Sequence, residues 1–488
     1  MAPSRTPSTP LRVPVARWRS VSRIAAAALV AIALPAGAAP DDDDVPRAGP
    51  EMVKRVFAEL GRVENEAIQQ YVDAVGQRLA RGVPRTASGF RFHVVDQWSP
   101  NAFALPDGSI FISRGILVLA SSEDELANVL AHEIIHVVER HAIDRMVVAD
   151  SANPFLIGFA RAAYLASFSR EQEREADSGG QVIAAAGGYD PAAMASFLRR
   201  LESIERIQIG TSRLPGFFDT HPATVERVGT THDRSAKIPF TAKPGVAPSA
   251  DAYARRLEGL AMGDDPSQGI FRGTRFLHPD LDFAIAFPDA WTLVNTPSAV
   301  GAIAPKGDAR IAVEFAGKGD DASVVASEYL RKELKKAEAR VESSNAISVG
   351  GRSGWELVVS VPTAAGAISA QLTFLPHQGT VYLISLAARA TAFSSYRGRA
   401  VATVRSLRPL DPAERDSIDV LRLRLARAEA GETLQELSRR TKNALDLQRT
   451  AVQNGIYTEG VLEEGKLLRV AVAERYAPRS SAVSAPPR

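Results

Sequence analysis

The pattern His132-Glu133-Ile134-Ile135-His136 combines side chains that bind a metal ion with one that moves a proton. Residues four positions apart share one face of an α-helix, so His132 and His136 can bind one zinc ion together. Glu133 then lies beside the ion, where its carboxylate can take a proton from an attacking water. Such a pattern also arises by chance in unrelated helices. It therefore predicts a zinc site only if a further ligand is found elsewhere in the chain.

A later acidic segment can supply that ligand. Two histidines leave a catalytic zinc one protein ligand short, and the chain has no cysteine, so a carboxylate is the usual supplier. Glu173 and Asp177 share a face of a helix that Ser169 and Gln172 begin as a capping box. One carboxylate can bind zinc while the other accepts the N–H of a ligand histidine. The alternative is a solvated acidic helix face, but the position 37 residues after His136 favours the metal site.

The helix that carries the first motif is expected to begin at the capping box Ser122-x-x-Glu125 and to run to about Met146. His141 lies five residues past His136, which is about 500° of helix rotation and roughly 140° from the metal-binding face. While the helix continues, His141 cannot share the zinc. We expect it to be structural or to orient a ligand. Glu175 is expected to point away from the metal.

Two short strands are predicted before this helix, at 101–104 and 109–112, around a Pro-Asp-Gly turn. In zinc proteases of this helix type, a strand at the edge of the cleft pairs with extended substrate through main-chain hydrogen bonds. Either strand could be that edge, and an ordinary hairpin is the alternative. The candidate substrate strand consists of Asn101, Ala102, Phe103 and Ala104.

Two linked motifs resemble those of a known family. They are His132-Glu133-Ile134-Ile135-His136-Val137-x-x-Arg140-His141 and Ser169-Arg170-x-x-Glu173-x-Glu175-Ala176-Asp177, with flanking Asn101–Pro106, Gly188-Tyr189-Asp190-Pro191 and His221-Pro222. Over about 51–231 the chain resembles the HExxH zinc metallopeptidases related to the CAAX prenyl protease. The similarity is to their soluble periplasmic branch, which includes the β-barrel assembly-enhancing protease.

The resemblance assigns roles to individual residues. It implies one zinc ion per chain, bound by His132, His136 and Glu173. Glu133 would be the general base, and Asp177 would orient a ligand histidine. His221 and Arg227 would approach the active site, where they could stabilise the tetrahedral oxyanion. His221 could instead occupy the open zinc position and hold the enzyme latent, or it could be a loop histidine fixed by packing.

The first 39 residues indicate a signal peptide. Arginines precede an apolar run from Ile24 to Leu34, and Ala36-Gly37-Ala38 supplies a small-x-small cleavage pattern. No later run reaches the ~18 apolar residues of a membrane span, so no transmembrane segment is expected in the mature chain. We therefore expect an exported protein, in the periplasm if the host is Gram-negative. The net charge of +2 comes without a basic stripe, so no nucleic-acid partner is expected.

With 488 residues, of which 45% are hydrophobic, the chain is expected to form several domains. The predicted fold class is α+β: a mainly helical zincin-type metalloprotease domain with a small β-sheet, then an α/β sandwich domain and a small LysM-like βααβ module. The predicted boundaries are signal peptide 1–39, linker 40–50, metalloprotease 51–232, linker and short helix 233–268, accessory domain 269–409, LysM-like module 410–476 and disordered tail 477–488. Within these, helices are predicted at 51–81, 173–186, 322–341 and 392–407.

The C-terminal module is predicted from Gly431-Glu432-Thr433-Leu434, which resembles the Gly-Asp-Thr-Leu start of a LysM module. LysM modules bind N-acetylglucosamine chains, so 410–476 is either a peptidoglycan-binding unit or a degenerate structural copy. The leading functional hypothesis is an exported zinc endopeptidase that cleaves unfolded or misassembled envelope proteins. The alternatives are a chaperone or adaptor with a latent zinc site that binds through its C-terminal modules, and a cell-wall hydrolase. Intact Glu133 favours an enzyme.

Overall fold

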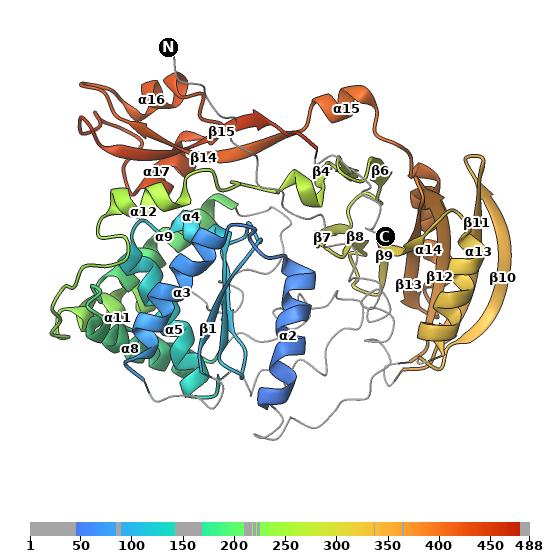
Figure 1. Cartoon of the computed structure of the whole chain (residues 1–488), viewed down its shortest axis with the longest axis horizontal. Coiled ribbons are helices and arrows are strands. Elements are labelled where there is room, and N and C mark those ends of the chain that lie inside the picture. Colours follow the sequence, from blue (N-terminus) through green and yellow to red (C-terminus); the bar gives the residue numbers. More distant parts are fainter. Residues whose placement is uncertain are drawn as a thin grey trace, which may run out of the picture.

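The structure is a computed structural model that describes most of the chain. The described residues are 45–83, 89–141, 168–208, 217, 221, 225–335, 337–363 and 366–478. The predicted signal peptide, the apolar segment before Phe168 and nearly all of the predicted tail lie outside them. A helical domain comes first along the chain, then a domain built on a large sheet, and then a β-ribbon with two short helices (Figure 1). Among the described residues, no helix is both long and apolar enough to cross a membrane.

The first domain surrounds one almost completely buried helix, α5. Its helices are α2 (Val45–Leu60), α3 (Glu66–Ala80), α4 (Arg114–Leu119), α5 (Glu123–Val138), α8 (Arg170–Gly187), α9 (Ala193–Gln208) and α11 (Val225–Ser235). Its sheet contains β1 (Arg91–Val95), β2 (Ala102–Ala104) and β3 (Ser109–Ser113) in the order β1-β3-β2, with β1 parallel and β2 antiparallel to β3. Helix α5 contacts α3, α8, α9 and β2. The domain is thus mainly helical with a small sheet, as predicted.

Three local predictions for this domain are wrong. The helix predicted over 51–81 is two helices, because Gly61 adopts a left-handed conformation (φ 73°) and Asn65 caps α3. Helix α2 begins at Val45, inside the predicted linker 40–50. Helix α5 ends at Val138 instead of Met146, because Arg140 is left-handed (φ 61°). A non-glycine residue adopts that conformation only at a cost of about 1–2 kcal/mol.

The predicted capping boxes at the two key helices form to different extents. Ser169 and Gln172 complete theirs at α8. At α5, the Ser122 hydroxyl accepts from the N–H of Glu125, but the Glu125 carboxylate accepts from the N–H of Ser121 (2.8 Å). Both helices nevertheless begin where the sequence indicates.

Helices α5 and α8 lie unusually close together because α8 has two glycines in its middle. A Cβ atom on Gly180 would lie 3.0 Å from the backbone nitrogen of His132. One on Gly179 would lie 2.7 Å from the Ile135 side chain. Without glycine at these positions the helix axes would have to separate. This close approach carries Glu173 toward the two histidines of α5.

The second domain is an antiparallel sheet with a helix on each face. The sheet order is β10-β11-β12-β13-β9-β8-β7, and a separate sheet has the order β4-β5-β6. The strands are β4 (Ile270–Arg272), β5 (Arg275–His278), β6 (Phe283–Ala286), β7 (Thr292–Asn295), β8 (Ala299–Ile303), β9 (Ala309–Lys318), β10 (Arg340–Val349), β11 (Arg352–Val361), β12 (Ile368–His377) and β13 (Thr380–Arg389). Helices α13 (Ala322–Tyr329) and α14 (Phe393–Ser406) cover opposite faces. The helix predicted over 322–341 is too long, because β10 begins at Arg340.

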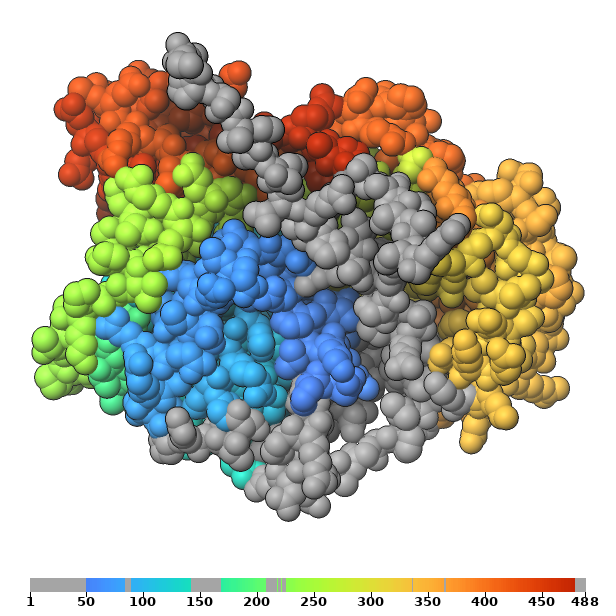
Figure 2. Space-filling model, in the orientation of Figure 1, coloured from blue at the N-terminus to red at the C-terminus, as the bar shows by residue number. Residues whose placement is uncertain are grey.

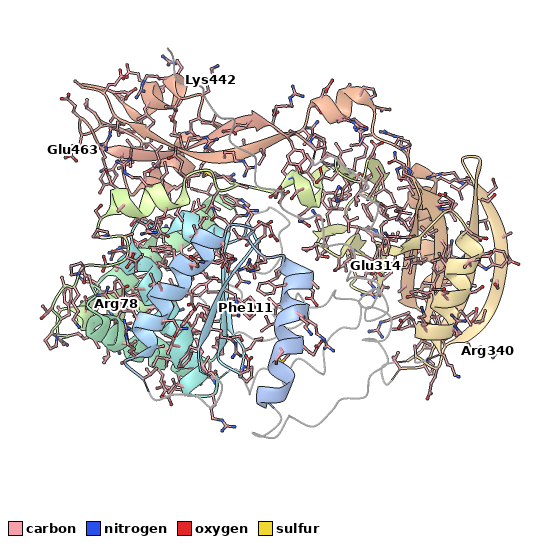
Figure 3. The ribbon with its side chains drawn as sticks, viewed as in Figure 1. Arg78, Phe111, Glu314, Arg340, Lys442 and Glu463 are labelled. Atoms are coloured by element: carbon pink, nitrogen blue, oxygen red, sulfur yellow. The ribbon has the colours of Figure 1, made fainter. Side chains whose placement is uncertain are left out.

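The C-terminal module has the predicted β-α-α-β order. It contains β14 (Asp419–Arg427), α16 (Leu434–Arg440), α17 (Leu447–Asn454) and β15 (Leu467–Arg475), after the short helices α12 (Ala250–Leu257) and α15 (Pro412–Asp416). Strands β14 and β15 form a two-stranded antiparallel ribbon. Whether the module is a LysM unit stays a prediction. Lys442 and Glu463 lie at its end far from the second domain (Figure 3).

The ribbon is part of the first domain's core. Leu423 and Ala471 are fully buried in the hydrophobic cluster that also contains α5. The main chain of 259–262 bonds to β14: Gly259 N–H donates to the Leu423 carbonyl and Met262 N–H to that of Leu421, both at 2.8 Å. Figure 2 shows this contact from outside, where the orange and red module lies on the green segment (Figure 2). The C-terminal module and the helical domain are therefore packed as one body.

Candidate metal centre

Four buried side chains converge between α5 and α8: His132, His136, Glu173 and His221. The Nε2 atoms of His132 and His136 are 3.0 Å apart, and His221 Nδ1 lies 3.1 Å from His132 Nε2. Glu173 Oε1 lies 2.7 Å from His221 Nδ1 and 3.5 Å from His136 Nε2. One atom from each residue can be chosen so that all four lie within 4.8 Å of one another. The predicted ligands are thus brought together, and His221 joins them.

The chemistry of this donor set fits a zinc ion. Three imidazole nitrogens and a carboxylate oxygen face one point, and a shared cation balances lone pairs that would otherwise oppose one another. Tetrahedral zinc accepts imidazole nitrogen and carboxylate oxygen in this way, and no thiolate is needed. Burial would raise the pKa of Glu173, but the imidazoles of His221 and His132 hold it well below its usual value. Glu173 is therefore ionised and suited to bind a cation.

Asp177 and Arg227 support the ligands from behind. Asp177 Oδ1 lies 3.0 Å from His132 Nδ1, the ring nitrogen that faces away from the cluster. The Arg227 guanidinium donates twice to Asp177, at 2.8 Å each, and its Nη1 lies 2.6 Å from Glu173 Oε2. Burial opposes ionisation of Asp177, yet the Arg227 charge keeps its pKa low. Both carboxylates are thus fixed by one arginine.

The other two histidine rings are held by phenylalanines. Phe168 stacks on His136 with ring centroids 3.7 Å apart, and Phe217 stacks on His221 at 4.3 Å. The N–H of Phe217 donates to the Pro100 carbonyl at 2.8 Å, which ties Phe217 to the chain two residues before β2. The sequence analysis singled out neither phenylalanine, because nothing in an isolated aromatic residue indicates which ring it will cover.

The predicted catalytic residues Glu133 and Arg227 lie next to different members of the ligand cluster. Glu133 is completely buried, and its Oε1 lies 3.5 Å from His221 Nε2. Arg227 lies against the carboxylates of Glu173 and Asp177. His141, which the rotation argument kept from the zinc, reaches Nδ1 of His136 at 3.0 Å. Glu175 was expected to point away, and its Oε2 lies 3.4 Å from His141 Nε2.

The predicted substrate strand β2 is the edge strand of its sheet. Asn101 and Leu105 exchange main-chain hydrogen bonds with β3. In an antiparallel pair such bonding alternates, so the peptide groups of Ala102 and Ala104 point to the other side. Among the described residues, no strand pairs with that side, and β2 contacts α5.

The N-terminal end of α5 is fixed by groups from distant parts of the chain. The buried Glu123 carboxylate accepts from the hydroxyls of Tyr71 (3.0 Å) and Tyr189 (2.9 Å) and from the N–H groups of Val246 and Ala247. Since Glu123 begins the helix that holds both ligand histidines, these bonds position the metal centre from one end.

Two arginines connect the same region to the C-terminal module. Arg469 on β15 donates to the carbonyls of Val118 (2.9 Å) and Ala120 (2.5 Å), just before α5. Arg200 on α9 donates to the Val452 carbonyl (2.6 Å) and to Glu125 (3.2 Å).

Comparison with known proteins finds similarity over the helical domain. Residues 66–235 match the model of peptidase family M48. The chain is 27% identical over 259 residues to the β-barrel assembly-enhancing protease of Yersinia pestis, covering 48% of this chain and 52% of that protein. It is 26% identical over 239 residues to the Escherichia coli protein of that name, covering 44% and 48%. The chain spans about half the length of these relatives.

Two further matches concern smaller parts. The mitochondrial metalloendopeptidase OMA1 of Schizosaccharomyces pombe is 31% identical over 175 residues, covering 32% of this chain and 50% of that protein. The solution structure of cyanobacterial PsbP from Synechocystis aligns with 30% of this chain and 99% of its own, with 12% identity and a TM-score of 0.25. A TM-score this low supports no conclusion about the fold.

Proposed function

We propose that the protein is a zinc-dependent endopeptidase that cleaves unfolded or misassembled proteins of the cell envelope. The match of residues 66–235 to the model of peptidase family M48 supports this proposal. The observation that carries the proposal is the convergence of three imidazoles and a carboxylate beside a buried glutamate. Two of these imidazoles, from His132 and His136, together with the Glu173 carboxylate and the buried Glu133, are the three ligands plus general base that hydrolysis of a peptide bond at a zinc ion needs. The resemblance of the chain to zinc metallopeptidases supports the same assignment.

Glu133 is the proposed general base. Zinc, when bound, supplies a Lewis acid and lowers the pKa of a water. Glu133 takes a proton from the attacking water and returns it to the leaving amine, so the peptide bond breaks with no net change at the carboxylate. Its complete burial strengthens its electrostatic interactions with charged groups at the site.

His221 is the proposed cause of a latent state. Its Nδ1 lies among the ligand atoms, at the position that a substrate or water needs in a catalytic zinc site. Movement of the segment that carries His221 would open this position. The displaced imidazole would remain near the reacting carbonyl, where it could stabilise the oxyanion.

Arg227 has a different proposed role from the one that the sequence suggests. All three of its nitrogens are near the Asp177 and Glu173 carboxylates. We propose that it holds these carboxylates in place, since a guanidinium with bidentate carboxylate contacts has few donors left for an oxyanion.

Extended substrate is proposed to pair with the free side of β2. The outward peptide groups of Ala102 and Ala104 offer main-chain donors and acceptors for β-strand addition next to α5. Because main-chain pairing does not depend on side-chain identity, it suits substrates that share only an unfolded backbone. Asn101 and Phe103 bond toward β3 and would set the position of the strand.

The proposed location is the periplasm. Residues 1–39 have the pattern of a cleaved signal peptide, and the bacterial relatives are named for β-barrel assembly, a process of the outer membrane. The alternative remains a chaperone or adaptor with a latent zinc site. Proteolysis that depends on Glu133 separates the two, since a binding protein does not need the base.

The test uses the mature protein with casein as an unfolded substrate. Cleavage is expected with zinc and is expected to stop with a chelator. Glu133→Gln is expected to retain zinc and to lose cleavage. Glu139→Gln is a matched control at the end of the same helix and is expected to cleave at the wild-type rate. Full-rate cleavage by Glu133→Gln would overturn the assignment. Zinc binding without cleavage by any variant would favour the chaperone.

A second candidate function is peptidoglycan binding by residues 410–476. Tyr457 (89% exposed) and Val461 (66% exposed) are two of the large apolar side chains that face solvent. The main chain of Val461 forms a β-bridge with Thr433, so Val461 lies beside the Gly-Glu-Thr-Leu segment. An exposed aromatic ring suits a sugar face. A pull-down on purified peptidoglycan tests the idea: wild type is expected to sediment and Tyr457→Ser to stay in solution. Wild type in the supernatant would remove the function.

A further inference from the structure

We infer that His141 and Glu175 act together to orient His136, so that this zinc ligand has a carboxylate partner through an intervening imidazole. His136 Nδ1 lies 3.0 Å from His141 Nδ1, and His141 Nε2 lies 3.4 Å from Glu175 Oε2. The inference concerns the zinc site on which the proposed function rests. It assigns roles to two residues that the motif alone leaves without any.

The chain bends in a costly way to make this contact. On a continuous helix His141 would lie roughly 140° from His136's metal-facing side. Helix α5 instead ends at Val138, and left-handed Arg140 returns the chain toward the helix. Strained backbone of this kind persists where surrounding structure requires it, often at functional sites. Here the residue that follows the strained position is the one that contacts the ligand.

The two contacts fix which nitrogen of each ring carries hydrogen. His136 must present the lone pair of Nε2 to the metal, so its hydrogen is on Nδ1. That N–H donates to His141 Nδ1, which must therefore be the acceptor. His141 then carries its hydrogen on Nε2, on the side of Glu175. The carboxylate at the end favours this arrangement of hydrogens over its reverse.

The two ligand histidines of α5 are thus supported differently. His132 contacts Asp177 directly, and Asp177 is buried and bound by Arg227. The Nδ1 atom of His136 instead reaches a carboxylate through His141, and the Glu175 side chain is 52% exposed. The support of His136 therefore reaches the surface, whereas that of His132 is enclosed.

Phe168 does not replace this contact. Its ring stacks on His136 with an interplanar angle of 17°, which fixes the plane of the imidazole. Stacking still permits a 180° flip of the ring about the Cβ–Cγ bond, which keeps the ring plane but exchanges Nε2 with Cε1. The bond between His136 Nδ1 and His141 Nδ1 disfavours that flip and keeps Nε2 facing the other ligand atoms. The two contacts are complementary.

The test measures zinc affinity, by competition with a chromophoric chelator, and the unfolding temperature of the zinc-free protein. His141→Leu keeps most of the side-chain volume and removes the acceptor. It is expected to bind zinc about 10- to 100-fold more weakly, with the zinc-free unfolding temperature within a few degrees of wild type. Glu175→Gln is expected to weaken binding less, in the same direction. Glu171→Gln is the matched control, because Glu171 is 83% exposed on the same helix and pairs with Arg174; it is expected to bind zinc as wild type does.

His141→Gln tests orientation more directly, because its amide oxygen can accept the His136 N–H. It is expected to recover part of the affinity lost in His141→Leu and part of the visible spectrum of the Co²⁺-substituted protein. Zinc affinity of His141→Leu within twofold of wild type would overturn the inference, as would equal losses in His141→Gln and His141→Leu. Neither readout involves proteolysis. A wild-type protein that binds zinc without cleaving casein would therefore count against the proposed function alone.

Discussion

Replacing Arg469 with methionine tests whether the C-terminal module stabilises the segment before α5. The guanidinium donates to the buried carbonyls of Val118, Ala120 and Gln453. An orphaned buried carbonyl costs about 1–3 kcal/mol, so three cost roughly 6 kcal/mol. Burial lowers the pKa of Arg469 to about 10, and losing that charged group returns about 3 kcal/mol of desolvation. The expected net loss in the free energy of unfolding is therefore about 3 kcal/mol.

A loss of that size lowers the unfolding temperature by about 6–12 °C in a unit of 150–250 residues. Thermal unfolding of the zinc-free protein measures it, and hydrogen exchange of the amides of 116–122 should accelerate in the same variant. Arg424→Met is the matched control on the same ribbon, because Arg424 is 40% exposed and pairs with Glu474. Surface pairs of this kind contribute about 0–1 kcal/mol. Equal shifts in the two variants would refute the reasoning.

Three other perturbations have defined outcomes. Gly180→Ala would place a Cβ atom 3.0 Å from the backbone of His132, so we expect about 1–3 kcal/mol of destabilisation and weaker zinc binding. Gly229→Ala is the control, because a Cβ atom there meets open space, and it should be neutral or slightly stabilising. Equal zinc affinity in the two variants would contradict the tight packing. Burial raises the pKa of Glu314 to about 7 from 4.5, so its protonated form stabilises the second domain fully below about pH 4.5 and that contribution is lost as pH rises through 7 (Figure 3). Glu314→Gln should therefore flatten the fall in unfolding temperature between pH 5 and 8, and an unchanged pH profile would count against it. His221→Ala should raise the initial rate of casein cleavage, and an equal or lower rate would contradict latency.

The ligands on α5 and α8 could be predicted because helical periodicity fixes which residues share a face. His132 with His136, and Glu173 with Asp177, depend only on a spacing of four. The position of His221 depends on where a loop returns 85 residues after His136, so spacing gives no information about it. Only the family resemblance brought His221 near the site, and it left three roles open.

The end of α5 and the length of the helix after Asp321 were predicted wrongly. Propensity favours continuing a helix through Arg140, and only tertiary contacts can offset the cost of its left-handed conformation. The strand β10 forms at the edge of the sheet by pairing with β11 across the two-residue turn Gly350-Gly351, a hairpin signal that the helix prediction did not use. The pair Gly179-Gly180 was available as a signal of close helix packing. When the partner helix is not known, however, two glycines indicate only that a helix is weak.

The bonds to Glu123 have a consequence for the order in which the protein can mature. Two of its four donors belong to residues 246 and 247, beyond residue 235, where the match to the M48 family ends. A growing chain that has emerged only as far as residue 235 would bury this carboxylate with both tyrosines but without the two N–H groups. The histidine-bearing helix is therefore fully stabilised only after the following segment has been made. In the folding of an exported chain, the candidate metal site on this helix would therefore be completed late.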